Sequence, residues 1–171
     1  KHILVTSGPT HEPIDPVRYI ANRSSGAQGT AIAKALAALG ADVTFVTGPA
    51  DVPPPNGVRV IKVQTAAEML TAVMEAPASD AAVFAAAVAD WRVENAGPSK
   101  IKKDGNGLPT LEFAENPDIL AGISAPGKKR PKLVVPQNQG CQRPTEIPES
   151  LESCLEYIIF APVPPPYLKR F

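Results

Sequence analysis

The sequence predicts an α/β protein with a doubly wound, mostly parallel, Rossmann-like sheet and helices on both of its faces. From Lys1 to about Val135, short apolar runs of strand length alternate with segments whose apolar residues recur at helical spacing. The connections between these segments are short. Strand–helix–strand units with short connections favour parallel pairing and right-handed crossovers.

The first predicted strand is the apolar run Ile3–Val5, which ends in the turn residues Ser7–Pro9 and is typical of a strand buried on both faces. A polar, proline-marked stretch follows, and then a loop of small residues from Asn22 to Gly29. From Thr30 onward the apolar residues have helical spacing. Gly40 is expected to end this helix as its C-terminal cap.

Three further strands and a second helix are predicted before residue 91. The strands are "ADVTFVTGP", the alternating run 58–63, and the small-residue run "AAVFAAAVAD" that ends at Asp90. The run Thr65–Glu68 has the pattern of a capping box and is expected to begin the helix. Its apolar face is predicted to consist of Met69, Leu70, Val73 and Met74.

After Asp90 the regular pattern loosens. The stretch "WRVENAGPSKIKKDGNG" is polar and basic, and Gly97 on one side and Gly105 and Gly107 on the other flank its lysines, which predicts a mobile flap. The run 111–113 resembles an edge strand, Asn116–Asp118 is expected to open a short helix, and Leu133–Val135 to begin another strand.

A change of composition predicts a boundary after Val135, since seven of the twenty prolines lie beyond it. Residues 1–135 are therefore interpreted as a nucleotide-binding α/β domain. Residues 136–171 are interpreted as a divergent, proline-rich segment of the same domain, with room for one helix near residues 148–158.

Composition also excludes several classes of partner. Seventeen basic and seventeen acidic residues cancel, so no net field attracts nucleic acid or an anionic membrane, and any anion site must be local. No run approaches the roughly 18 apolar residues of a membrane span. Cys141 and Cys154 lack a CxxC pattern or paired histidines, which disfavours a metal site and indicates a reducing, cytoplasmic location.

A ligand of such a sheet binds outside the carboxyl ends of the strands. Gly26 and Gly29 would let the backbone approach a phosphate, with Ser24, Ser25 and helix N–H groups as donors, although both glycines would equally serve close packing of helix on strand. Four segments are expected to border one crevice: Ser7–Thr10, Asn22–Gly29, Thr47–Pro49 and Ala86–Asp90.

A nicotinamide dinucleotide site is opposed by two features. Ser24 stands at the first glycine of GxGxxG, and Thr47–Pro49 occupies the strand end where an acid would bind the ribose. The chain also has no GxxxxGK[ST] motif, which disfavours a P-loop kinase. A short-chain dehydrogenase relative stays the less favoured alternative.

Charged residues near the predicted crevice have two interpretations each. Asp90 fits a carboxylate that holds a divalent metal against a polyphosphate, or a turn aspartate. Lys100, Lys102 and Lys103 fit ammonium groups that close over an anion, or a solvated basic stretch. Asp118 fits a helix-start residue that also serves a nucleotide.

Taken together, "TSGPTHEPIDPVRYIANRSSGAQGTAIA", "AAAVADW", "KIKK" and "ENPDIL" resemble, in this order and spacing, the phosphopantothenoylcysteine synthetase family. The resemblance implies a coenzyme A biosynthesis ligase that joins 4′-phosphopantothenate to L-cysteine through a cytidylyl-acyl intermediate. It implies CTP as co-substrate, Mg²⁺, a homodimer, and, in bacteria, frequent fusion to a phosphopantothenoylcysteine decarboxylase.

The resemblance also implies roles for residues. Asn22 and Lys100 would be catalytic, Arg18 and Asn22 would bind the phosphopantothenate, and Asp90 would bind the metal. The nucleotide would be bound by Gly8, Pro9, Thr10, Ser24, Ser25, Gly26, Ala86, Ala87, Val88, Asp90, Lys100, Asn116, Pro117, Asp118 and Ile119.

After Val135 the sequence departs from the family pattern. The Gly-Phe-Ala-x-Glu-Thr segment, the later lysines and the Ala-Asn-Asp segment of the family are not found in "PQNQGCQRP" or beyond. An inactive relative, or a nucleotide-binding interaction protein, is therefore the alternative function.

Overall fold

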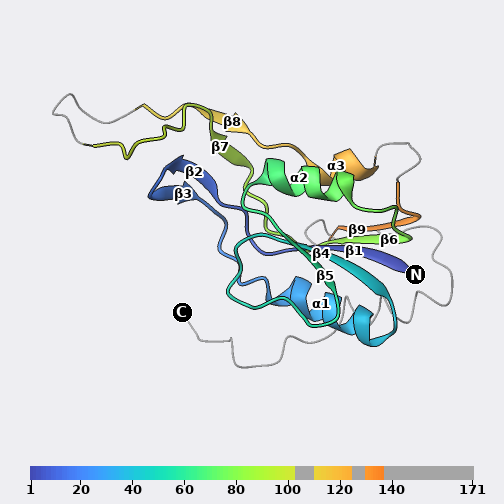
Figure 1. The fold of residues 1–171 in the computed structure, drawn as a ribbon. Helices are drawn as coiled ribbons and strands as arrows, with labels where there is room; N and C mark the ends of the chain where they lie inside the picture. Colours follow the sequence, from blue (N-terminus) through green and yellow to red (C-terminus); the bar gives the residue numbers. More distant parts are fainter. Residues whose placement is uncertain (103–109, 125–129, 137–171) are drawn as a thin grey trace, which may run out of the picture. The chain divides into compact units, whose positions relative to one another are not determined.

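The computed structural model describes residues 1–102, 110–124 and 130–136, all of which belong to one compact unit, Lys1–Asn138 (Figure 1). Several predicted features lie outside the described residues: Lys103, Gly105 and Gly107, the helix near 148–158, Cys141 and Cys154.

A parallel sheet of five strands confirms the predicted fold class. Its order is β5-β4-β1-β6-β9, and all four neighbouring pairs are parallel. The chain proceeds outward from β1 to β4 and β5 and then returns to β6 on the other side of β1, so the strand order reverses between β1 and β6. The strands are β1 (His2–Ser7), β4 (Asp42–Thr47), β5 (Arg59–Lys62), β6 (Ala81–Phe84) and β9 (Leu133–Pro136).

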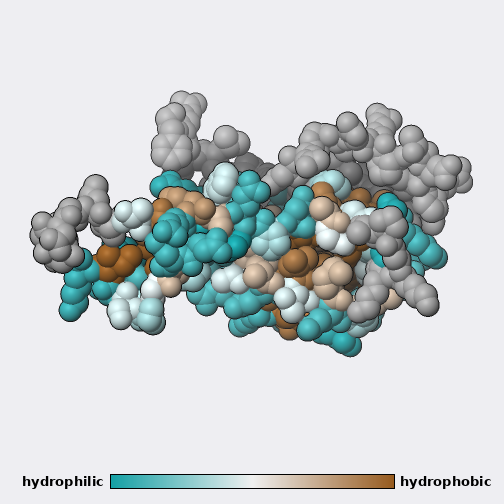
Figure 2. Space-filling view, turned by 90° about the horizontal axis from the view of Figure 1, so that it is seen from above, coloured by the Kyte–Doolittle hydropathy of each residue, from teal (hydrophilic) through white to brown (hydrophobic). Residues whose placement is uncertain are grey.

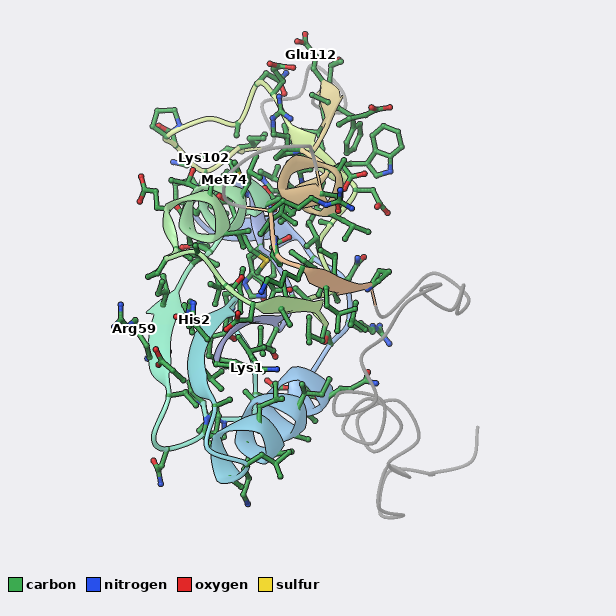
Figure 3. The ribbon with its side chains drawn as sticks, turned by 90° about the vertical axis from the view of Figure 1, so that its right-hand side faces the viewer. Lys1, His2, Arg59, Met74, Lys102 and Glu112 are labelled. Carbon is green, nitrogen blue, oxygen red and sulfur yellow. The ribbon has the colours of Figure 1, made fainter. Side chains whose placement is uncertain are left out.

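Helices cover both faces of this sheet. α1 (Ala27–Ala38) lies on one face, and α2 (Ala66–Glu75) and α3 (Ile119–Ser124) lie on the other (Figures 1 and 3). Figure 3 shows the strands from their amino ends, with Arg59 on the outer edge of β5. The core beneath α2 and α3 is formed by Leu4, Val46, Met69, Val73, Ala76, Ala82, Ile119 and Ile123.

The second helix begins at the predicted place with a modified capping box. The Thr65 hydroxyl accepts a hydrogen bond from Glu68 N at 3.2 Å, whereas the Glu68 carboxylate accepts from Gln64 N, one residue before the expected donor. Met69 and Val73 are buried and Leu70 packs against the core. The prediction for Met74 is wrong, because this side chain lies on the outer side of the helix and is 43% exposed.

A short antiparallel hairpin was not predicted. β2 (Glu12–Asp15) pairs with β3 (Arg18–Ile20), with an irregular register between Pro13 and Asp15. The prolines and the irregular register hide the alternation that indicates a strand. The hairpin lies beyond the carboxyl ends of the sheet strands (Figure 1).

The strand that was predicted to end at Asp90 ends at Phe84 instead. The described pairing of β6 with β9 covers Ala81–Phe84, opposite Leu133–Pro136. A second antiparallel ribbon follows, in which β7 (Trp91–Val93) pairs with β8 (Phe113–Glu115). The first three residues of the predicted flap therefore belong to β7, and the rest of the flap lies in the sequence between β7 and β8.

No helix in the described part of the chain is both long and apolar enough to cross a bilayer. Figure 2, which looks onto the side of α2 and α3, shows hydrophilic residues interspersed with smaller hydrophobic areas.

Candidate functional site

The tips of β1 and β6 meet where the strand order reverses. Ala85 N donates to Thr6 O at 3.1 Å, and Ala87 N donates to Gly8 O at 2.9 Å. Ala89 N donates to the Thr10 hydroxyl at 3.0 Å. These bonds bring two predicted nucleotide-binding segments, 8–10 and 86–88, together at the edge of the sheet where α/β proteins bind ligands.

The loop before α1 reaches the same place. The side-chain amide of Asn22 donates to Val88 O at 2.8 Å, while the Asn22 side chain stays exposed. The predicted catalytic asparagine is therefore held against the predicted nucleotide-binding segment by a bond that spans 66 residues of sequence.

The first turn of α1 offers both backbone and hydroxyl groups. Gly26 precedes the helix in a left-handed conformation with φ 74°, which favours glycine. The hydroxyl of Ser25 accepts from Ala27 N at 3.3 Å, and that of Ser24 accepts from Gly26 N at 3.4 Å. Both hydroxyl oxygens accept within the loop, so their O–H groups are available to donate to an anion.

Two roles were considered for Gly26 and Gly29, approach of the backbone to a phosphate and close packing of the helix on a strand. The structure shows packing at Gly29. Gly29 lies inside α1, where an added Cβ would be 2.3 Å from the Ser7 hydroxyl oxygen and 2.5 Å from Ser7 Cβ. Ser7 is fully buried and its hydroxyl donates to Gly26 O. Gly29 therefore serves the close packing of α1 on β1.

The predicted segment Asn116–Ile119 is hydrogen-bonded to the end of residues 85–90, which follow β6 and are called the β6 extension here. Asn116 N donates to Asp90 O at 2.9 Å, and the Asn116 side-chain amide donates to Ala89 O at 2.8 Å. The Oδ1 atom of Asn116 is buried with no hydrogen-bond partner among the described residues, and a buried acceptor of this kind favours a donor from a ligand. Asp118 accepts from Ala121 N at 2.9 Å, which confirms its helix-start role.

The lysine-bearing connection is anchored to the β2–β3 hairpin. Ile101, between the exposed Lys100 and Lys102, donates its N–H to Asp15 Oδ2 at 3.1 Å and accepts at its carbonyl from Arg18 Nη2 at 3.0 Å. Arg18 also forms an ion pair with Asp15 at 2.5 Å. Arg18, which was predicted to bind phosphopantothenate, is thus already hydrogen-bonded to Asp15 and to Ile101, between Lys100 and Lys102.

Asp15 was not singled out in the sequence. Hydrogen bonding from Arg18 holds the pKa of its carboxyl well below its usual range, against the opposing effect of burial, and the amides of Val17 and Ile101 lower the pKa further. The Asp-Pro dipeptide before a turn and the arginine three residues later were the available signals.

A hollow of about 680 Å³ lies beside the strand tips. It is lined by the end of β4 with the following residues 48–54, the end of β5 with residues 63–64, and Glu68 of α2. Of the four segments expected to border one crevice, Thr47–Pro49 lines this hollow, and the lining includes no residue of Ser7–Thr10, Asn22–Gly29 or Ala86–Asp90. Ser25, Asp90 and Lys100 are not among its lining residues.

A dedicated metal cage is absent from the described part of the chain, where no three histidine, cysteine or acidic side chains gather. Asp90 is a single exposed carboxylate at the end of the β6 extension. Mg²⁺ in nucleotide sites is commonly held by one or two carboxylates together with phosphate oxygens and water. Asp90 therefore fits a metal that arrives with a polyphosphate.

Comparison with known proteins gives a family match over residues 1–137 and relatives that match most of the chain. Residues 1–137 match the family described as "DNA/pantothenate metabolism flavoprotein C-terminal domain". The chain is 50% identical over 136 residues to the coenzyme A biosynthesis bifunctional protein CoaBC of Vibrio cholerae, and 48% identical over 138 residues to that of Escherichia coli. Each match covers 78% of this chain and 34% of the relative, so the chain spans about a third of their length.

A solved structure of similar fold supports the same relationship. It is the crystal structure of the C-terminal domain of a coenzyme A biosynthesis bifunctional protein CoaBC, 35% identical, with a TM-score of 0.62. The match covers 78% of this chain and 62% of that domain.

Proposed function

This chain belongs to the family of the DNA/pantothenate metabolism flavoprotein C-terminal domain, and on that premise we propose that it is a phosphopantothenate–cysteine ligase of coenzyme A biosynthesis. The observation that carries the proposal is that three of its four motif segments are hydrogen-bonded to one another where the strand order reverses, while Ile101 of the fourth is bonded to Asp15 and Arg18 in the first. Asn22 donates a hydrogen bond to the carbonyl of Val88, and Asn116 donates hydrogen bonds to the carbonyls of Ala89 and Asp90.

The proposed reaction has two steps. The carboxylate of 4′-phosphopantothenate attacks the α-phosphorus of CTP, forms an acyl–phosphate bond and expels pyrophosphate. The amine of L-cysteine then attacks the activated carbonyl, forms the amide, loses a proton and releases CMP. Negative charge accumulates on phosphate oxygens in the first step and on a carbonyl oxygen in the second, so the site needs cations and hydrogen-bond donors.

The first step draws on the groups that stabilise phosphate charge. The O–H groups of Ser24 and Ser25, at the positive end of the α1 dipole, would donate to phosphate oxygens, and the ammonium of Lys100 would neutralise charge on the triphosphate. Small side chains at 86–88 allow the nucleotide to approach the backbone. Buried Asn116 Oδ1 offers an acceptor to a donor group of the nucleotide.

The second step is assigned to Asn22. Its side chain already uses one amide hydrogen on Val88 O, which fixes the direction of the other hydrogen and of the amide oxygen. A fixed donor of this kind stabilises an oxyanion without reorganisation. Arg18, exposed over 47% of its side chain, would contribute positive charge toward the phosphopantothenate.

Asp90 is the residue that would hold Mg²⁺, whose chemistry would be to neutralise charge on the triphosphate. The chain itself holds the backbone of Asp90 in place, because the Asp90 carbonyl accepts a hydrogen bond from Asn116 N. This position keeps the carboxylate at the end of the segment that also carries Val88.

A homodimer is part of the proposal. The hairpin exposes Val17 and Tyr19, at 59% and 54%, and the β7–β8 ribbon exposes Trp91 and Phe113, at 51% and 59%. Exposed apolar side chains on neighbouring elements favour a protein contact.

We further propose a cytoplasmic location and, because the relatives are named bifunctional, an association with a decarboxylase domain.

The test is pyrophosphate release by the purified chain with CTP, Mg²⁺, 4′-phosphopantothenate and L-cysteine. We expect Lys100→Ala to reduce release by about two orders of magnitude, the typical effect of removing a group that stabilises developing charge. Lys34→Ala is the control, because Lys34 is an exposed lysine of α1. Replacing CTP by ATP measures nucleotide preference.

The outcomes separate the candidate functions. Release that is lost in Lys100→Ala and kept in Lys34→Ala supports the ligase. No release from the unaltered chain, together with binding of CTP in a thermal-shift assay, supports the inactive nucleotide-binding relative instead. Thermal stabilisation by NAD and not by CTP would support the dehydrogenase alternative.

A further inference from the structure

The backbone of Ile101 is held on both of its polar groups by side chains of the β2–β3 hairpin. Asp15 Oδ2 accepts from Ile101 N at 3.1 Å, and Arg18 Nη2 donates to Ile101 O at 3.0 Å. Asp15 and Arg18 are themselves joined by an ion pair. We call this three-residue arrangement the Ile101 clamp.

The hairpin side of the clamp is rigidly built. The Asp15 side chain is fully buried, and its Oδ1 accepts from Val17 N at 2.9 Å and from Arg18 N at 3.0 Å. Its Oδ2 accepts from Arg18 Nε at 3.0 Å as well as from Nη2. A carboxylate bonded on both oxygens has no freedom to rotate, so it presents a fixed acceptor to Ile101.

The held residue lies between the two lysines of the connection that the structure describes. Lys100 and Lys102 are both exposed. Ile101 lies six residues beyond Asn95, whose side chain is hydrogen-bonded to the backbone of Thr110 and Glu112, just before β8. A lysine side chain loses considerable rotamer freedom when it is ordered on a ligand. Fixing the backbone beside it reduces the further cost of ordering the main chain.

We propose that Asp15, acting with Arg18, is a positioning residue that fixes Ile101 and thereby directs Lys100 and Lys102 toward the phosphates of the nucleotide. The identity of that ligand rests on the proposed function. The clamp itself is a property of the chain without any ligand, so it has a test of its own.

The clamp is tested first by trypsin digestion of the native chain without nucleotide. Asp15→Asn places an amide where Ile101 and Arg18 need an acceptor. We expect cleavage after Lys100 and Lys102 to accelerate about tenfold, the effect of losing a bond to a charged group. Glu94→Gln is the matched control, because Glu94 is an exposed carboxylate whose ion pair with Arg92 is long, at 3.8 Å. Cleavage of Asp15→Asn at the unaltered rate would overturn the proposal.

Arg18→Lys keeps the proposal testable if Asp15→Asn does not fold. A lysine keeps the positive charge but lacks the planar fork that reaches both Asp15 and Ile101 O. We expect a severalfold acceleration at the same two bonds. An unchanged rate in this variant would equally overturn the clamp.

Steady-state kinetics tests the positioning role. We expect Asp15→Asn to raise the KM for CTP about tenfold, which corresponds to the loss of one such bond, with a smaller effect on kcat. A merely structural role would lower the active fraction, and so kcat, without changing KM. Faster cleavage with an unchanged KM therefore contradicts positioning. If the unaltered chain releases no pyrophosphate, the proposed function fails, and digestion alone decides the clamp.

Discussion

Asn22 and Val88 are joined by a 2.8 Å hydrogen bond between the side-chain amide of the first and the backbone carbonyl of the second. This bond connects the loop before α1 to the segment that extends β6, across the point where the strand order reverses. It gives a direct way to separate the two steps of the proposed reaction.

Asn22→Asp is expected to slow turnover by about two orders of magnitude, because an oxygen replaces the donating amide and repels Val88 O. If Asn22 serves the second step, pyrophosphate should appear in a burst of one equivalent per site and then slow, and CMP release should lag behind. Rapid-quench measurement of both products checks this. Stability should change by less than about 0.5 kcal/mol, since the side chain is exposed.

Asn95→Asp is the control for this substitution. Asn95 is also exposed and also donates its amide to a carbonyl, that of Thr110, but it lies two residues after the end of β7. Comparable loss of turnover in the two variants would contradict a specific role for Asn22.

Gly29→Ala tests whether the close packing of α1 on Ser7 outweighs the higher helix propensity of alanine. Propensity alone would stabilise α1 by about 1 kcal/mol, whereas the new Cβ would meet Ser7 at 2.3–2.5 Å. Because overpacking a tight contact commonly costs about 1–3 kcal/mol, we expect net destabilisation, measured by urea unfolding. Ala31→Gly, at an exposed position of the same helix, should lose about 1 kcal/mol from propensity alone. A more stable Gly29→Ala variant would refute the packing role.

Thr65→Ala is expected to destabilise the fold by about 1 kcal/mol, because it removes the acceptor for Glu68 N at the start of α2. Thr71→Ala provides the comparison within the same helix. The Thr71 hydroxyl donates to Ala67 O, a bond that adds little to a helix, so this variant should be neutral or slightly more stable. Thermal unfolding of the two variants checks the difference, and equal destabilisation would argue against the cap.

The stability that Asp15 contributes should depend on pH in one direction. The ordinary pKa of an aspartate carboxyl is 3.8, and in the folded protein the pKa of Asp15 is lower than this. Folding therefore favours the deprotonated carboxylate. The contribution is therefore complete at neutral pH and is lost as pH falls below that ordinary value toward the folded one. Urea unfolding of the unaltered chain and of Asp15→Asn should show a stability difference that is constant above about pH 5 and shrinks below about pH 4. A difference that grows in acid would contradict this.

The sequence by itself determined the fold class, five sheet strands and three helices, because their apolar periodicity and capping residues act within a few positions along the chain. The order of the motifs also determined the family. Gly40 illustrates this local control: it has φ 80° after the end of α1, in the place where its lack of a side chain predicts a helix stop.

The tertiary structure alone decided the interactions that connect distant segments. Gly29 serves packing because β1 runs directly beneath it, and the bond between Asp15 and Ile101 spans 86 residues. The β2–β3 hairpin is similar, since its prolines and irregular register leave no periodic signal. Local sequence patterns record the conformation of a segment, whereas these contacts depend on which strand tips and loops the parallel topology places side by side.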